Sequence, residues 1–100
     1  MKQKNLYDER GIITLEALEK LETIGRSVSC ECPNHLVKLL KQAKEFTLYQ
    51  KNCINEKPAD ELIHKWLLSS SVTIEHIISN TIVNLARMEG MLDENNHFVE

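Results

Sequence analysis

The stretch "PADELIHKWLLSSSVTIEHIISNTIVNLARMEGML", residues 58–92, decides the fold. Asp60 and Glu61 come first, where the positive end of a helix dipole favours acidic side chains. Apolar and small residues then recur every three or four positions, at Ile63, Leu67, Ser70, Ile74, Ile77, Thr81, Leu85, Met88 and Leu92. This is the period of an α-helix, so the sequence predicts one helix over about 59–92, roughly 50 Å long. A break at Ser69–Ser71 is the alternative.

A second helix is predicted over about 33–54, just ahead of the turn sequence INEKP. Pro33 stands at the first helical position, where proline is best tolerated. The opposite face of this helix carries four lysines and is expected to be solvated. Trp66 of the following helix is predicted to lie in the core, near the level of Phe46. The apolar face of the second helix is formed by Leu36, Leu39, Leu40, Ala43, Phe46, Thr47 and Cys53.

A short helix is predicted over about 14–24, with Thr14 as its N-cap and Gly25 just after its end. Its apolar residues are Leu15, Leu18, Leu21 and Ile24. A helix of roughly ten residues is not stable alone and must dock on other elements. The predicted fold class is therefore all-α: an antiparallel helical hairpin (about 33–54 and 59–92) with the short helix packed against it. The chain is expected to form a single domain over 1–100, with a lead-in at 1–13 and a frayed tail at 93–100.

Composition limits the classes of function. The chain has 100 residues, 42% hydrophobic and 27% charged, with a net charge of −3. Direct nucleic-acid binding is not expected, because such domains usually carry a basic excess. No secretory leader is recognised, and no apolar run approaches the ~20 residues that span a bilayer, so no membrane partner is expected. The sequence predicts a cytoplasmic protein whose three cysteines are reduced.

The predicted third helix exceeds the second by about a dozen residues, and its apolar stripe continues to the end. The short helix covers only part of this excess. The remainder is expected to need a partner, and a second copy of the chain is the simplest one, giving a dimeric helical bundle. The predicted homodimer interface consists of Ile78, Ile82, Leu85, Met88 and Met91.

The segment SCECPNHL, residues 29–36, concentrates chemically versatile side chains. Cys30, Cys32 and His35 are possible zinc or iron ligands, and the predicted hairpin register places His76 as the fourth. Alternatively, Cys32 at the N-cap of a helix gains thiolate character and redox reactivity. The preferred interpretation is structural, since cysteine is often a small buried residue and Cys-Pro is an acceptable helix start. On that interpretation the chain has no cofactor.

No Gly-rich phosphate loop and no Ser–His–Asp arrangement is found, and the chain is predicted not to be an enzyme. The leading hypothesis is a small cytoplasmic helical module that dimerises and acts as a regulatory or adaptor protein for another protein. The alternative is a metal- or redox-sensing domain that uses Cys30, Cys32 and His35.

The order "CECPNHL … EFTLYQ … C … ADELIHKWL … IEHI … LARMEGML" resembles a helical region that follows the DNA-binding domain in some MerR-type bacterial regulators. The resemblance covers residues 11–92 and implies an effector or dimerisation module. "LYDERGII" is similar to the end of a MerR helix-turn-helix, but only six residues precede Tyr7. The resemblance therefore implies a chain without the DNA-reading domain. The residues that carry the resemblance are Cys30, Cys32, Pro33, His35, Leu36, Phe46, Tyr49, Cys53 and His64.

Overall fold

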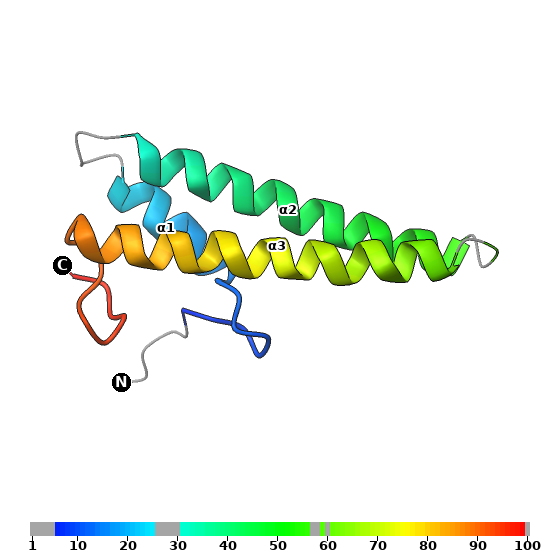
Figure 1. Cartoon of the computed structure of the whole chain (residues 1–100). Helices are drawn as coiled ribbons and strands as arrows, with labels where there is room; N and C mark the ends of the chain where they lie inside the picture. The colour runs from blue at the N-terminus through cyan, green and yellow to red at the C-terminus, as the bar shows by residue number, and fades with distance from the viewer. Residues whose placement is uncertain (1–5, 26–30, 57–58, 60, 100) are drawn as a thin grey trace.

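The computed structural model describes residues 6–25, 31–56, 59 and 61–99. It has three helices, α1 (Leu15–Gly25), α2 (Cys32–Glu56) and α3 (Glu61–Met88). α2 and α3 run antiparallel as a long hairpin, and α1 packs against one end of it, so the molecule is elongated, 50 × 31 × 17 Å (Figure 1). The predicted all-α class, with a short N-terminal helix beside two longer packed helices, is confirmed.

α3 passes through the serine triplet without a break. Ser71 is buried, and its hydroxyl donates a hydrogen bond to the carbonyl of Leu68 in the preceding turn, at 2.9 Å. The hydroxyl is thus satisfied within the helix and does not disrupt the backbone bonds around it. The alternative of a break at Ser69–Ser71 is therefore wrong.

α3 ends at Met88, four residues earlier than predicted. Gly90 has a φ of +78°, its N–H donates to the carbonyl of Arg87, and the N–H of Met91 donates to the carbonyl of Ala86. This pair of bonds is the Schellman motif, in which a left-handed glycine ends a helix. The chain then turns back, and the Met91 side chain enters the core. Gly90 is the residue that could have marked this end in the sequence.

The segment after α3 is held by hydrogen bonds where the sequence predicts a frayed tail. The Asp93 carboxylate accepts bonds from the backbone N–H groups of Asn95 and His97, at 2.8 and 2.9 Å. Leu92 and Phe98 form an isolated antiparallel bridge. The predicted frayed tail thus has defined backbone contacts over the described residues 93–99.

The lead-in before α1 belongs to the hydrophobic core. The backbone N–H of Ile13 donates to the hydroxyl of Ser79 on α3, at 3.1 Å. Thr14 follows, and its hydroxyl accepts a bond from the N–H of Ala17, so the predicted N-cap is confirmed. The core comprises Leu6, Ile12, Ile13, Ala17, Leu18, Leu21, Val37, Leu40, Ile82, Val83, Ala86, Met91 and Leu92.

This core lies at the end of the hairpin that α1 covers. α2 contributes Val37 and Leu40 from its first half, and α3 contributes Ile82, Val83 and Ala86 from its second half. Nearer the α2–α3 turn the buried residues that join the two helices are mostly polar. The packing of apolar side chains therefore stabilises one end of the molecule more than the other.

We expect Leu40→Ala to lower the free energy of unfolding by about 2–5 kcal/mol, because it leaves a cavity in this core. Leu62→Ala is the matched control, since Leu62 is 83% exposed on α3, and it should change stability by less than about 0.5 kcal/mol. Urea unfolding followed by circular dichroism measures both. Equal losses from the two variants would contradict this placement of the core.

Asp8 holds the turn of the lead-in by accepting bonds from the backbone N–H groups of Arg10 and Ile12. Burial raises the pKa of Asp8, but these bonds and the Arg10 guanidinium outweigh burial, so the pKa lies below its ordinary value. A carboxylate with a depressed pKa contributes stability above its unfolded pKa and loses it as the pH falls through the folded value.

We therefore expect Asp8→Asn to lower the free energy of unfolding at neutral pH. The difference from the wild type should shrink as the pH falls below the ordinary value of 3.8. Urea unfolding at a series of pH values measures it, with Glu9→Gln on the exposed neighbour as control. A difference that stayed constant in acid would show that the charge of Asp8 does not stabilise the turn.

Candidate functional site

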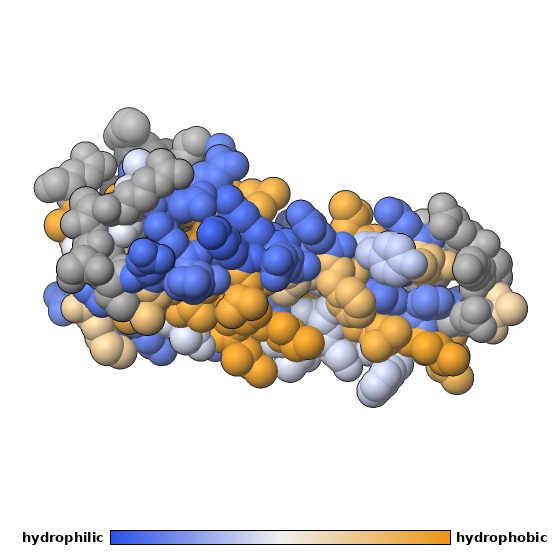
Figure 2. Space-filling view, turned by 90° about the horizontal axis from the view of Figure 1, so that it is seen from above, coloured by the Kyte–Doolittle hydropathy of each residue, from blue (hydrophilic) through white to orange (hydrophobic). Residues whose placement is uncertain are grey.

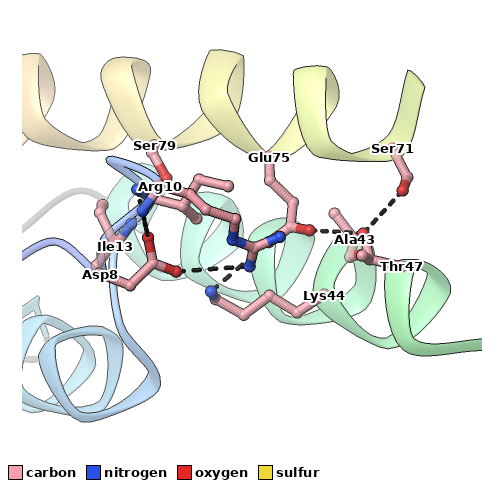
Figure 3. Close-up of polar contacts among 10 residues, drawn as sticks. Asp8, Arg10, Ile13, Ala43, Lys44, Thr47, Ser71, Glu75 and Ser79 are labelled. Atoms are coloured by element: carbon pink, nitrogen blue, oxygen red, sulfur yellow. Dashed lines mark hydrogen bonds and ion pairs between the residues drawn. The ribbon is translucent and has the colours of Figure 1, made fainter. Parts of the chain in front are cut away.

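A buried carboxylate lies between α2 and α3 (Figure 3). Glu75 of α3 has no exposed surface, and its Oε2 accepts a hydrogen bond from the Thr47 hydroxyl of α2, at 2.5 Å. The same Thr47 oxygen lies 2.9 Å from the Ser71 hydroxyl. The Lys44 ammonium approaches Glu75 Oε1 to 3.6 Å. We call these four residues the polar seam.

A second polar pair joins the helices nearer the turn. The Gln50 side-chain oxygen lies 2.8 Å from Nδ1 of His64, and Gln50 is buried. Polar groups removed from water must be hydrogen-bonded, because an unpaired one costs about 1–3 kcal/mol. The seam and this pair therefore define which face of α3 meets α2.

The apolar stripe of α3 lies on a different face from the seam. Ile77 is 61% exposed and Met88 is 80% exposed. Ile77 stands two residues after Glu75, which turns a helix by about 200°, so the two side chains cannot both face α2. The apolar stripe therefore does not form the α2–α3 interface at this level. The predicted placement of Trp66 in the core is wrong, since its side chain is 66% exposed.

The exposed apolar residues of α2 and α3 lie on the same flank of the hairpin. Phe46 comes one residue before Thr47, Ile74 comes one residue before Glu75, and Thr47 and Glu75 face each other. One residue turns a helix by about 100°. Because the two helices run antiparallel, the residue before Thr47 in α2 and the residue before Glu75 in α3 point to the same side of the hairpin. Phe46 and Ile74 are therefore neighbours on one flank.

α1 and the lead-in cover the opposite flank. His76 stands one residue after Glu75, and its ring lies beside Gly11 of the lead-in. Lys41 of α2 forms an ion pair with Glu22 of α1, at 3.2 Å. The flank that carries Phe46 and Ile74 has no such cover among the described residues.

Large apolar side chains gather on the uncovered side, which we call the apolar flank. None of its eight residues is charged, and each is about half exposed or more. With about 150–250 Å² for a large side chain, they present on the order of 900 Å², above the ~300–600 Å² of the largest patch on a typical monomer. Figure 2 shows hydrophobic residues along one long edge of the molecule. The apolar flank consists of Leu39, Phe46, Tyr49, Ile63, Trp66, Ile74, Ile77 and Met88.

The predicted dimer interface needs correction. Ile82 and Met91 are 3% and 2% exposed, so both are used in the core of their own chain. Ile78 and Leu85 are half-buried, and of the five predicted residues only Met88 is exposed, at 80%. α3 has 28 residues and α2 has 25, so the predicted overhang of about a dozen residues does not exist. The exposed apolar surface is a flank of the hairpin.

The described residues do not bring the predicted metal ligands together. Cys30 lies outside the described part of the chain. Cys32 is exposed at the start of α2, and the exposed His35 ring lies 3.8 Å from the Glu31 carboxylate. Within the described ranges, no three His, Cys, Asp or Glu side chains are close enough to hold a metal ion. Metal binding that involves Cys30 stays a prediction.

The hairpin register separates His35 from His76. Lys44 contacts Glu75, so His35, nine residues earlier in α2, lies level with residue 84 of α3. His76 is eight residues away from that level, roughly 12 Å along the helix. His76 is also on the flank that the lead-in covers. The role of His76 as a fourth ligand beside His35 is therefore contradicted.

No family model matches the chain, and neither a curated protein nor a solved structure matches it. The resemblance to MerR-type regulators stays a prediction. Among the residues that the structure describes, no helix is both long enough and apolar enough to span a membrane.

We expect Thr47→Val to lower the free energy of unfolding by about 2 kcal/mol, because it removes the donor to the buried Glu75 carboxylate and keeps the side-chain shape. Thr73→Val is the control, since Thr73 is exposed and its hydroxyl bonds only to Ser69 in its own helix. The control should change stability by less than about 0.5 kcal/mol. Chemical unfolding of both variants measures the difference, and equal effects would show that the seam contributes no net stability.

Proposed function

We propose that the protein is a small non-enzymatic helical module that dimerises through the apolar flank and acts in the cytoplasm as a regulator or adaptor of another protein. The observation that carries the proposal is the apolar flank itself. A soluble monomer rarely exposes so large a contiguous apolar surface, and such surfaces usually bind other proteins or membranes.

The composition of the apolar flank supports protein binding. Aromatic residues and methionine are enriched at the centres of protein interfaces, and charged residues are depleted there. The flank contains Phe46, Tyr49, Trp66 and Met88, and none of its residues is charged. Its exposed area of about 900 Å² is close to the ~800 Å² per partner of a standard interface.

The proposal agrees with what the MerR resemblance implies, an effector or dimerisation module. The buried polar groups of Glu75 and Thr47 bond to each other between the helices and so act in holding the fold. We therefore include the absence of catalysis and of a resident cofactor in the proposal.

We expect the wild-type protein to have twice the chain mass of 11.6 kDa in light scattering coupled to gel filtration. Ile77→Glu places a charge in the middle of the apolar flank and should weaken the dimer by about 2 kcal/mol or more, at least ~30-fold in dissociation constant. Its helix content by circular dichroism should not change, because Ile77 is exposed in the single chain.

Leu48→Glu is the matched control, because Leu48 is 59% exposed, close to the 61% of Ile77, but stands one residue after Thr47 and so lies on the opposite flank. It should leave the dimer intact. A wild-type protein that stays monomeric at high concentration would refute dimerisation. Equal weakening by Ile77→Glu and Leu48→Glu would refute the role of the flank.

A further inference from the structure

Along α3, the residues of the apolar flank and of the apolar stripe beside it follow nearly the same order in both directions from one centre. The centre lies midway between positions 75 and 76. Isoleucines come first on either side, then hydroxyl residues, then large apolar residues. The residues at equal distance from the centre are Ile74 and Ile77, Ser70 and Thr81, Trp66 and Leu85, and Ile63 and Met88.

We propose that the second copy binds the apolar flank antiparallel, with α3 against α3 and a twofold axis at this centre. The inference rests on the proposed function, which requires a dimer but does not state its geometry. A twofold interface brings the same surface of both copies together, so each residue must suit the one at equal distance from the axis. The pairing places Ile74 against Ile77 of the second copy.

The same pairing brings the hydroxyls together. Ser70 lies within the apolar stripe, and Thr81 occupies the equivalent position on the other side of the centre. A hydroxyl buried against hydrocarbon loses its hydrogen bonds to water, which is costly. In the antiparallel pairing Ser70 lies level with Thr81 of the second copy, so the two can bond to each other.

α2 is compatible with the same axis. Side-chain contacts between α2 and α3 pair residues whose numbers add up to between 114 and 122, and near the middle of the hairpin the contact of Thr47 with Ser71 gives 118. The centre of the α3 stripe is therefore level with the point between Gln42 and Ala43 of α2. Leu39 and Phe46 stand equally far from that point on either side. In the dimer, Leu39 packs against Phe46 of the second copy, and the four long helices form an antiparallel bundle.

The other face-to-face twofold arrangement fits less well. It places α3 against α2 of the second copy, with Ile74 and Ile77 level with residues 41–44 of that helix by the same register. That stretch is Lys-Gln-Ala-Lys and offers no large apolar side chain. Lys41 pairs with Glu22 on the covered flank, and Lys44 lies at Glu75. On the apolar flank, Ile74 and Ile77 would therefore meet only the small Ala43 or the polar Gln42.

Disulfide formation between single-cysteine chains tests the geometry. The background carries Cys30→Ser, Cys32→Ser and Cys53→Ala, and it must keep the dimer mass and helix content of the wild type. Ser70→Cys and Thr81→Cys are introduced into separate chains with different tags, which are coexpressed and oxidised. We expect a covalent heterodimer in several-fold higher yield than any covalent homodimer of Ser70→Cys, because Ser70 is eleven residues, about 16 Å, from its counterpart across the axis.

Two further pairs complete the test. Leu39→Cys with Phe46→Cys should also form a covalent heterodimer, which probes the axis on α2. Glu19→Cys with Thr81→Cys is the control for random collision, since Glu19 is exposed on α1, which covers the opposite flank. No heterodimer excess in either expected pair, with the dimer mass retained, would overturn the antiparallel geometry and leave the proposed dimer standing. A monomeric wild-type protein would overturn both.

If the cysteine-free background does not fold, oppositely charged variants test the same pairing. Ser70→Glu and Thr81→Lys are made separately in the natural chain. Each alone should weaken its homodimer, and a mixture should recover dimer mass because the new carboxylate lies level with the new ammonium. A mixture no more dimeric than the separate variants would overturn the antiparallel pairing.

Discussion

α3 is a single unbroken helix, so the face that it presents at one end determines the face that it presents at the other. At the end covered by α1, Ile82, Val83 and Ala86 enter the core, and the Ser79 hydroxyl accepts a bond from the lead-in. Burial of three such side chains is worth several kcal/mol, at about 1.5–3 kcal/mol for each large one. That end therefore sets the rotation of the whole helix, and Glu75 is brought to face α2 as a consequence.

The polar seam follows from that rotation. A carboxylate facing a neighbouring helix needs donors, and Thr47 and Lys44 of α2 supply a hydrogen bond and a nearby positive charge. The Ser71 hydroxyl beside it donates to the Leu68 carbonyl of its own helix, so small polar side chains occupy this level and the helices meet without an extended apolar interface. The large apolar residues of α3, which would suit a helix–helix contact, are left on the outer flank.

In the proposed dimer, stability and binding thereby belong to different parts of one small chain. The core of the α1 end, with the lead-in and the residues after Met88 folded into it, holds the single chain together. The apolar flank runs along the hairpin and contributes little to that core. Substitutions on the flank can therefore change association without unfolding the chain, and substitutions in the core do the reverse.

The sequence by itself determined that three helices form, roughly where each one lies, that Thr14 caps the first, and that α3 carries an apolar stripe. It also singled out Trp66 and Met88 of the candidate site, but placed Trp66 in the core and Met88 in a dimer interface at an overhanging end of the helix. Periodicity specifies which residues share a helix face and not which face meets a neighbour, because that choice depends on contacts between segments distant in the chain. The tertiary structure decided it through the α1-end core and the Thr47–Glu75 bond. It also set the hairpin register that separates His35 from His76, since register follows from packing between helices and not from the length of the turn.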